Sequence, residues 1–243
     1  ISRPDFPLLQ FFLRSAPGTY QHSLQVANLA EQAAELIGAD ALQTRVGALF
    51  HDIGKAMNPS FFIENQPAEN IDPHDDIPPE ESAAAIIAHV TDGVALARKH
   101  RLPRRMDDFI LEHHGTMVTR YQHNQAVQAA GGDASKVDIE KFRYPGPRPQ
   151  SRETALLMLA DGTEARTRAQ RPNDEESIRK LVLSTIEAAQ KQGQLDDTKL
   201  TLRDLSIITD AFVTVLKGTH HPRIAYPKEI PAGEDVATIP HKP

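Results

Sequence analysis

The sequence contains no cysteine and no tryptophan, and each absence excludes a class of structure. Without cysteine there is no disulfide framework and no thiolate metal site. Aromatic residues make up only 5% of the 243 residues, so a core must be filled mostly by Leu, Ile, Val and Ala. No run approaches the roughly 18 apolar residues of a membrane helix. The net charge of −6 argues against binding to a nucleic acid polymer, whereas a local site for a small anion stays open.

The two ends of the chain differ from its middle. The stretch ISRPDFPLLQFFLRSAPGTY is interrupted by prolines and has no basic segment before it, which is not the pattern of a signal peptide. Because it lacks an initiator Met, we expect an excised or processed portion of a longer protein. We expect one domain over residues 1–226 and a poorly ordered tail over residues 227–243, which are polar and contain prolines.

The spacing of apolar residues predicts an all-α fold, because it follows the helical period and alternating β patterns are missing. Helices are expected over residues 19–37, 40–54, 81–99, 104–114, 118–130 and 151–168. Gly38 should end the first of them, Asp40 should cap the second, and Ser151 should cap the last. Two final helices should begin at capping boxes, Asn173 with Glu176 and Thr201 with Asp204. Residues 55–80 and 131–150 are expected to be irregular, and segments of this length are usually lids, binding loops or disordered.

The stretch LFHDIGKAM places His51 and Asp52 directly after an apolar run. Such pairs arise by chance, so the short motif has little weight by itself. The His-Asp and His-His pairs fall in two settings. His51-Asp52 and His113-His114 lie on predicted helices, whereas His74-Asp75 lies in a loop and His220-His221 precedes Pro222. The two pairs on helices can therefore lie on a buried helix face, whereas the pairs in the loop and before Pro222 cannot.

Helical geometry predicts that polar side chains of several helices point inward. His22 shares the apolar stripe of Val26 and Leu29. On helix 40–54 the apolar face includes Leu42 and Val46, and the side that carries His51 also carries small residues. The full inward set is His22, His51, Asp52, His89, His113, His114 and Asp161. Burying one unpartnered polar group costs roughly 2–7 kcal/mol, and the whole set would exceed a domain's net stability of about 5–15 kcal/mol. These groups are therefore expected to share a metal cluster.

A dinuclear site would satisfy the whole set. Each imidazole gives a lone pair, each carboxylate offsets cation charge, and Asp52 as a bridge leaves positions free for water and substrate oxygens. Two divalent ions with two carboxylates keep a positive charge, which suits a phosphate. Nitrogen and oxygen ligands without thiolate favour Mn or Fe, with Zn as an alternative.

Each residue has a simpler interpretation when taken alone. A single His22 or His89 is more often a hydrogen-bonded core histidine, and a single Asp161 is more often a cap or an arginine partner. The pair at 113 and 114 alone would suit the negative end of a helix dipole. Lys55 alone is most often solvated, and FRYPGPRPQ is most often only a loop. The joint occurrence of the inward set on apolar faces favours the metal site.

The order His…His-Asp…His…His-His…Asp resembles the HD-domain metal-dependent phosphohydrolases, in the form that holds two metals. The stretches RVGALFHDIGK, FFIENQ, HHGT and MLADGTEA look closer still to the catalytic domain of the seven-transmembrane-HD receptors, which are cyclic-di-AMP phosphodiesterases. The resemblance covers about residues 6–226. The cyclic-di-GMP-cleaving HD subfamily is disfavoured, because Gly115 follows the His-His pair and that subfamily's Gly-Tyr-Pro signature is missing.

The resemblance implies an all-helical HD-domain bundle with a buried dinuclear metal site. One metal would take His22, His51 and Asp161, the other would take His89, His113 and His114, and Asp52 would bridge them. It further implies hydrolysis of cyclic-di-AMP to linear 5′-pApA through attack of a metal-bridging hydroxide, with Asp52 and Lys55 as catalytic residues. Lys55, Tyr121, Arg143 and Tyr144 are the expected substrate-binding residues.

Two other functions stay open at this point. One is a different HD enzyme, either a nucleotide phosphohydrolase or a di-iron oxygenase acting on a small polyol. The other is a non-catalytic signalling module that binds a cyclic dinucleotide. In the family a membrane bundle precedes the HD domain, so this chain is expected at the cytoplasmic side of the cell membrane, attached through a missing N-terminal region. A homodimer is compatible with the sequence.

Overall fold

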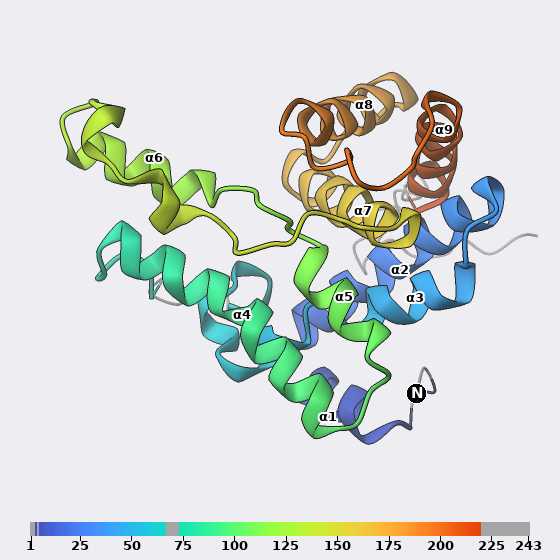
Figure 1. The fold of residues 1–243 in the computed structure, drawn as a ribbon, viewed down its shortest axis with the longest axis horizontal. Helices are drawn as coiled ribbons and strands as arrows, with labels where there is room; N and C mark the ends of the chain where they lie inside the picture. The colour runs from blue at the N-terminus through green and yellow to red at the C-terminus, as the bar shows by residue number, and fades with distance from the viewer. Residues whose placement is uncertain (1–2, 4, 67–72, 220–243) are drawn as a thin grey trace, which may run out of the picture.

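The computed structural model describes residues 3, 5–66 and 73–219, and this part of the chain is helical without a strand (Figure 1). The expected all-α fold is confirmed. The helices are α1 (Pro7–Ser15), α2 (Pro17–Ile37), α3 (Ala41–Phe50), α4 (Pro79–Lys99), α5 (Arg105–Glu112), α6 (Arg120–Ala129), α7 (Arg152–Gln170), α8 (Glu175–Lys191) and α9 (Leu202–Thr219). Short 3₁₀ helices are η1 (Ile53–Met57), η2 (Pro59–Phe61), η3 (Ile63–Asn65), η4 (Ala134–Lys136) and η5 (Ile139–Phe142).

Helix α2 is the centre of the main bundle, because α3, α7 and α9 all pack against it (Figure 1). Helix α8 covers α7 and α9, and α4 packs on α5 and η1. One large apolar core joins these elements, with Phe12, Phe50, Phe109 and Phe212 fully buried in it. Most of the rest of this core is Leu, Ile, Val and Ala, as the scarcity of aromatic residues predicts.

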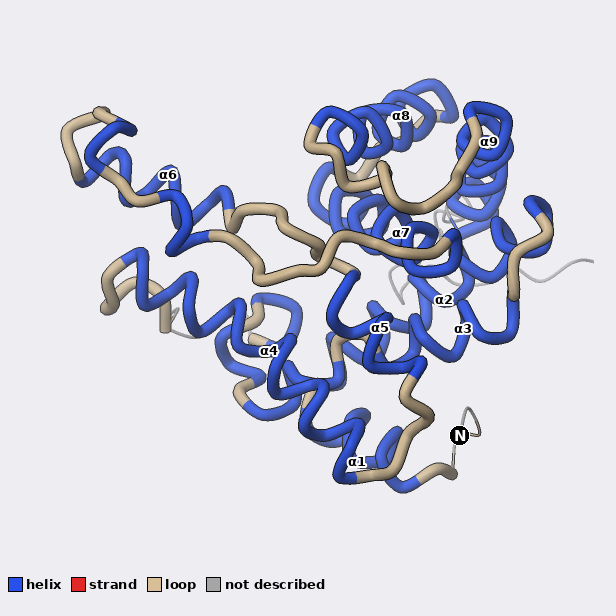
Figure 2. Tube along the Cα trace, viewed as in Figure 1, coloured by secondary structure: helices blue, strands red, loops and turns tan. Residues whose placement is uncertain are grey.

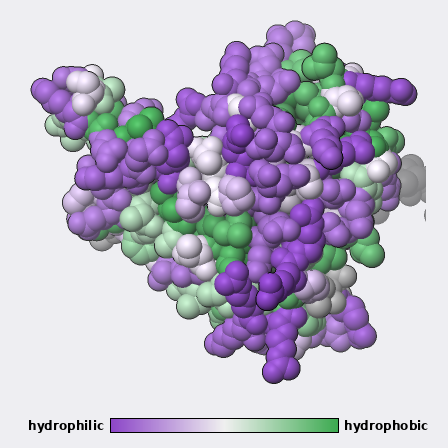
Figure 3. All heavy atoms as spheres, viewed as in Figure 1, coloured by the Kyte–Doolittle hydropathy of each residue, from purple (hydrophilic) through white to green (hydrophobic). Residues whose placement is uncertain are grey.

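Helix α6 and the segment after it form an arm that extends from the bundle beside α4 (Figure 2). A separate small cluster of Ala83, Ala126 and Phe142 holds the arm to the first half of α4. The chain crosses between arm and bundle at an isolated bridge between Val118 and Arg143. Figure 3 shows that hydrophilic residues cover most of this face, with hydrophobic residues gathered where the arm meets the body.

Two glycines let backbones touch where η1 crosses α4. A Cβ atom on Gly54 would lie 1.9 Å from the carbonyl oxygen of His89 and 2.5 Å from the backbone nitrogen of Gly93. No side chain fits at Gly54 without separating the two elements. This close approach brings the residues just before η1 next to the middle of α4.

Several expected helix ends are confirmed. Gly38 ends α2 with a left-handed φ of 69°, and Asp40 caps α3 by accepting the Gln43 backbone N–H at 2.9 Å. Ser151 and Thr154 form a capping box at the start of α7. Thr201 and Asp204 accept each other's backbone N–H groups at the start of α9, as expected.

Other expectations were wrong. Helix α1 was not predicted, because prolines near the start were interpreted as breaks, whereas Pro7 occupies the first turn of a helix, where its missing N–H costs nothing. Helix α3 ends at Phe50 rather than near Gly54, so His51 and Asp52 lie in the turn before η1. Leu42, expected on an apolar face, is 67% exposed.

The segment over residues 55–80 is more ordered than expected in its described part, because η1, η2 and η3 follow one another directly. His74 is half-buried and donates from Nε2 to the Phe61 carbonyl at 2.7 Å, while the Ser82 hydroxyl donates to Nδ1 at 2.7 Å. This histidine fastens η2 to α4. The expected tail over residues 227–243 and the pair His220-His221 lie outside the described residues, as does the expected boundary at residue 226.

The cap of α8 is Asp174 and not Asn173, because the Asp174 carboxylate accepts the Ser177 backbone N–H at 2.8 Å. We expect Asp174→Ala to lower the melting temperature by roughly 2–4 °C, since it leaves a donor of the first turn unsatisfied. Asn173→Ala should leave it unchanged. Thermal unfolding of both variants by circular dichroism checks this, and the reverse order of effects would contradict the assignment.

In the described residues we find no helix with the length and apolar character needed to span a membrane.

Candidate metal centre and substrate cavities

The inward set expected from the sequence comes together at one place in the fold. Its members come from α2 (His22), the turn after α3 (His51 and Asp52), α4 (His89), the turn after α5 (His113 and His114) and α7 (Asp161). Six of them are buried and His114 is half-buried. Two groups within this set have ligand atoms close enough to hold a cation, and Asp52 belongs to both.

Asp52 lies at the middle of the cluster, and its two carboxylate oxygens face different histidines. Oδ2 is 3.3 Å from His51 Nε2 and 3.6 Å from His22 Nε2. Oδ1 is 3.3 Å from His89 Nε2 and 3.5 Å from His113 Nε2. A carboxylate in this position can coordinate two cations, one through each oxygen.

Asp161 contacts histidines of both groups. Its Oδ1 atom is 3.0 Å from His22 Nε2 and 3.8 Å from His51 Nε2, and its Oδ2 atom is 3.8 Å from His114 Nδ1. Asp161 therefore completes the group formed by His22, His51 and Asp52. The other group consists of Asp52, His89, His113 and His114.

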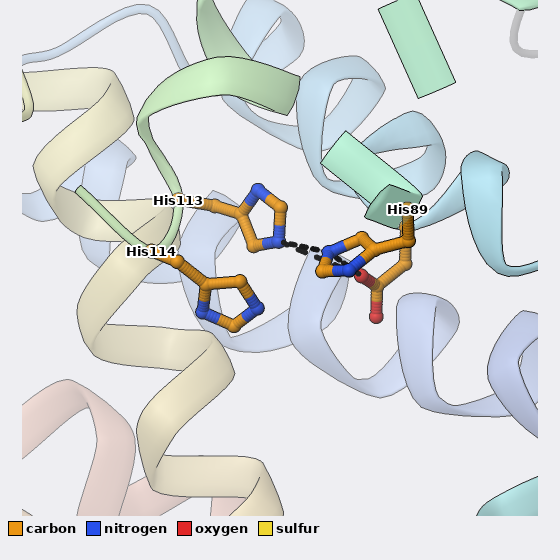
Figure 4. Close-up of side chains that lie close together, drawn as sticks. His89, His113 and His114 are labelled. Carbon is orange, nitrogen blue, oxygen red and sulfur yellow. Dashed lines mark hydrogen bonds and ion pairs between the residues drawn. The ribbon is translucent and has the colours of Figure 1, made fainter. Parts of the chain in front are cut away.

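Backbone carbonyls orient three of the histidine rings. The Nδ1 atoms of His51, His89 and His113 lie 2.7, 2.6 and 2.8 Å from the carbonyl oxygen three residues earlier. A carbonyl oxygen only accepts, so each Nδ1 carries a proton, and each Nε2 presents a lone pair to the centre when its ring is neutral. Figure 4 shows the rings of His89, His113 and His114 turned toward one another.

A bound cation would satisfy these lone pairs, whereas the described part of the chain offers them too few hydrogen-bond donors. His89 Nε2 and His113 Nε2 are 3.2 Å apart, yet neither has a proton to donate once both Nδ1 protons are bound to carbonyls. The buried atoms His51 Nε2 and Asp52 Oδ1 have no hydrogen-bond partner among the described residues. Buried polar atoms without a partner are costly, and a metal ion would supply the missing partner by binding the Asp52 carboxylate and the neutral form of His51.

Burial and neighbouring charges shift the pKa values of the cluster residues in different directions. Burial raises the pKa of Asp52, but the charges of His51 and Lys55 outweigh it and hold the pKa well below its usual range. Burial lowers the pKa of His51, and the carboxylate of Asp52 reverses this and raises it to about 10. Burial lowers the pKa of His89 to about 3. The metal-free cluster thus combines ionised carboxylates with a neutral histidine that is ready to act as a ligand.

Lys55 has a fixed place beside the cluster rather than in solvent. Its Nζ atom is 2.8 Å from Asp52 Oδ2 and 3.1 Å from Glu64 Oε1, and it lies over the Phe62 ring at 5.0 Å. Burial lowers the pKa of Lys55, but the two carboxylates outweigh it and raise it. The ammonium stays charged and points at the centre.

Sequence reasoning assigned no role to Glu64, which lies in the segment expected to be irregular. The Thr19 hydroxyl donates to Glu64 Oε1 at 3.0 Å and accepts from Asn65 Nδ2 at 2.7 Å. A Cβ atom on Gly18 would lie 1.8 Å from the Glu64 carbonyl oxygen, so α2 and η3 touch through their backbones. The only sequence signal was FFIENQ, which contributed to the family resemblance without indicating this contact.

Two cavities flank the cluster at the base of the arm. One, of about 490 Å³, is lined by His114, Tyr144 and Met158 among others, and the second, of about 430 Å³, is lined by Phe62 and Glu64 among others. Ile86, Tyr121 and Gln122 line both. Their sizes are within the range of small-molecule sites.

The expected substrate-binding residues differ in their exposure and in whether they line a cavity. Tyr144 is buried against the His114 ring, with centroids 4.3 Å apart, and Tyr121 is 67% exposed between the cavities. Arg143 lines neither cavity. Its guanidinium donates to Glu140 at 2.9 Å and to the Thr116 carbonyl at 2.8 Å.

Comparison with known proteins gives consistent matches. The family model described as HD domain matches residues 19–166. The chain is 42% identical to the cyclic-di-AMP phosphodiesterase PgpH of Bacillus subtilis (strain 168) and 37% identical to PgpH of Listeria monocytogenes serotype 1/2a (strain 10403S). Both alignments cover 94% of this chain and 31% of the relative, so the chain spans about a third of the length of these relatives.

The fold also matches a solved structure. The crystal structure of the L. monocytogenes phosphodiesterase PgpH HD domain in complex with cyclic-di-AMP aligns with a TM-score of 0.83 and 37% sequence identity. The alignment covers 90% of this chain and 100% of that one.

Proposed function

Since the chain belongs to the HD-domain family, we propose that it is a metal-dependent phosphodiesterase that hydrolyses cyclic-di-AMP to linear 5′-pApA. The observation that carries the proposal is the position of Asp52, whose two oxygens face two separate groups of histidines. The names of the PgpH relatives and the cyclic-di-AMP complex of the matching structure support the choice of substrate.

The residues that would hold two divalent ions follow from the two groups. His22, His51 and Asp161 would hold one ion, His89, His113 and His114 the other, and Asp52 would bridge them. The donor set of imidazole nitrogens and carboxylate oxygens favours Mn or Fe, with Zn as an alternative. Such ions, when bound, supply Lewis acidity and activate water for in-line attack at phosphorus.

The protein's own groups bind and orient the phosphate. Glu64 holds the Lys55 Nζ atom beside Asp52, which is the proposed bridge between the two ions. From this position Lys55 would donate to an oxygen of a phosphate bound at the ions. In the overall reaction one P–O bond to water forms and the P–O3′ bond breaks. The leaving 3′ oxygen gains a proton, and the 5′-phosphate stays on the product.

The two cavities suit the two halves of a cyclic dinucleotide. They meet at Ile86, Tyr121 and Gln122, and one is lined by His114 of the cluster, whereas the other is lined by Glu64, the partner of Lys55. Tyr121 is exposed and would offer a ring face for base stacking, and Tyr144 would do so through its contact with His114. Arg143 would act less directly, because it holds the turn at Thr116.

The setting of the whole protein is part of the same proposal. The chain spans about a third of its relatives, and the resemblance to the seven-transmembrane-HD receptors supports a place at the cytoplasmic side of the membrane, attached through another part of a longer protein. The proposed role is then removal of a second messenger in the cytoplasm. Homodimer formation stays a prediction.

The test is hydrolysis of cyclic-di-AMP beside cyclic-di-GMP by protein loaded with Mn²⁺ or Fe²⁺, without oxygen, with product identification by mass spectrometry. We expect cyclic-di-AMP to give 5′-pApA, cyclic-di-GMP to react more slowly, and chelation to stop both reactions. Binding of cyclic-di-AMP without any product would instead favour a signalling module. Hydrolysis of cyclic-di-AMP under these oxygen-free conditions would reject an oxygenase.

A further inference from the structure

One histidine of the cluster is held differently from the others. His51, His89 and His113 donate from Nδ1 to backbone carbonyls. The Nδ1 atom of His22 is instead hydrogen-bonded to the carboxylate of Glu164. A carbonyl partner is neutral and fixed by the helix, whereas a carboxylate partner adds a negative charge directly behind the ligand.

Glu164 is built into the bundle at this contact. It lies one helical turn after Asp161 on α7, and α7 packs along α2. The two carboxylates therefore face opposite ends of one ring, with Asp161 Oδ1 3.0 Å from His22 Nε2 and Glu164 at Nδ1. The Glu164 side chain is 12% exposed, and on its outer side Arg168 Nε is 3.6 Å from Oε1.

The contact makes the two halves of the cluster unequal in charge. Beside the shared Asp52, the half with His22 and His51 has Asp161 as a ligand candidate and Glu164 behind His22. Lys55 also lies at this half, 2.8 Å from Asp52 Oδ2, but Glu64 at 3.1 Å offsets its positive charge, so the negative charge of Asp161 and Glu164 remains. Among the described residues, the half with His89, His113 and His114 has no further carboxylate of its own apart from Asp161 Oδ2, 3.8 Å from His114. A cation is attracted more strongly to the half with the larger negative charge.

We propose that Glu164 is a positioning residue, which fixes the His22 ring with Nε2 toward the cluster and makes the His22–His51–Asp161 position the tighter of the two cation positions. This rests on the proposed function only through its assignment of the metal ligands. Glu164 touches neither the proposed substrate cavities nor the reacting atoms, so its effect is exerted through His22.

The test is a Mn²⁺ titration of the metal-free protein, followed by electron paramagnetic resonance and metal analysis. Wild type should bind two ions per chain, the first more tightly, and give the signal of a coupled pair. Glu164→Ala should weaken the first binding step about 10–100-fold and give a single-ion signal at equal Mn²⁺. Glu164→Gln keeps an acceptor for the Nδ1 proton but loses the charge, so it should lie between the two.

Glu153 provides the matched control, because it is a carboxylate on the same helix with 18% exposure and it contacts Arg105 and the Asp40 backbone instead of the cluster. Glu153→Ala should keep wild-type Mn²⁺ binding. Wild-type affinity for both ions in Glu164→Ala, or in Glu164→Gln if the alanine variant does not fold, overturns the proposal. An equal loss in Glu153→Ala also overturns it.

Failure of the proposed function looks different. Wild-type protein that binds two Mn²⁺ ions in order but leaves cyclic-di-AMP intact would refute the phosphodiesterase and leave the role of Glu164 standing. Wild-type protein that binds fewer than two ions refutes both.

Discussion

Asp52→Ala is expected to abolish hydrolysis of cyclic-di-AMP, with a rate loss of at least about 10³-fold, equivalent to about 4 kcal/mol. The reason is geometric, because each Asp52 oxygen faces a different pair of histidines at 3.3–3.6 Å. Removing the carboxylate takes one ligand from both proposed ions and removes the negative charge that holds them close together. Both metal occupancy and turnover should fall.

The measurement is the initial rate of 5′-pApA formation together with the metal content after dialysis. Asp52→Asn keeps the shape of the side chain but removes its negative charge. This variant should lose metal affinity and keep the helical circular dichroism signal. Asp107 provides a matched control, since its side chain is 13% exposed and pairs with Arg98 at 3.2 Å, away from the cluster. A folded Asp52→Ala protein with wild-type activity would show that this residue is not the bridge.

Gly54→Ala is expected to lower the melting temperature by roughly 5–15 °C. The new Cβ atom would lie 1.9 Å from the His89 carbonyl oxygen and 2.5 Å from the Gly93 nitrogen. Both are backbone atoms, so no side-chain rotation relieves the overlap and η1 must move away from α4. That movement also separates Asp52 from His89, and we expect the second ion to be lost.

Differential scanning calorimetry and metal analysis check this prediction. Gly218→Ala is the control, because Gly218 is an exposed helical residue, and in the described part of the chain no atom outside its own helical turn lies within 4 Å of an added Cβ. That substitution should be neutral or stabilising by up to about 1 kcal/mol, as alanine favours helices. Equal melting temperatures for wild type and Gly54→Ala would mean that the close approach of η1 and α4 is not needed.

The inward set could be predicted from the sequence because each helix imposes its own period. His22 is predicted to be buried by the residues one and two turns away on the same helix, without knowledge of any partner. Local chemistry also predicted the caps at Asp40, Ser151 and Thr201, because each acts within one turn. The error at Asn173 has the same origin, since neighbouring Asn and Asp residues are equally good caps.

Glu64 and Glu164 could not be predicted in the same way, because their partners lie 45 and 142 residues away in the chain. Glu164 follows Asp161 by one turn, yet only the packing of α7 against α2 places it behind the His22 ring. Glu64 pairs with Lys55 in the same place where η3 touches α2 at Gly18.

Helical periodicity and local hydrogen bonding by themselves determined the all-α fold, most helix ends and which histidines and aspartates face inward. The tertiary structure alone decided that Asp52 presents one oxygen to each group of histidines, that Lys55 is held by Glu64, and that a carboxylate supports His22. The physical reason is range, because the period of a helix fixes the direction of a side chain, whereas the distance between side chains on different helices depends on how the helices pack.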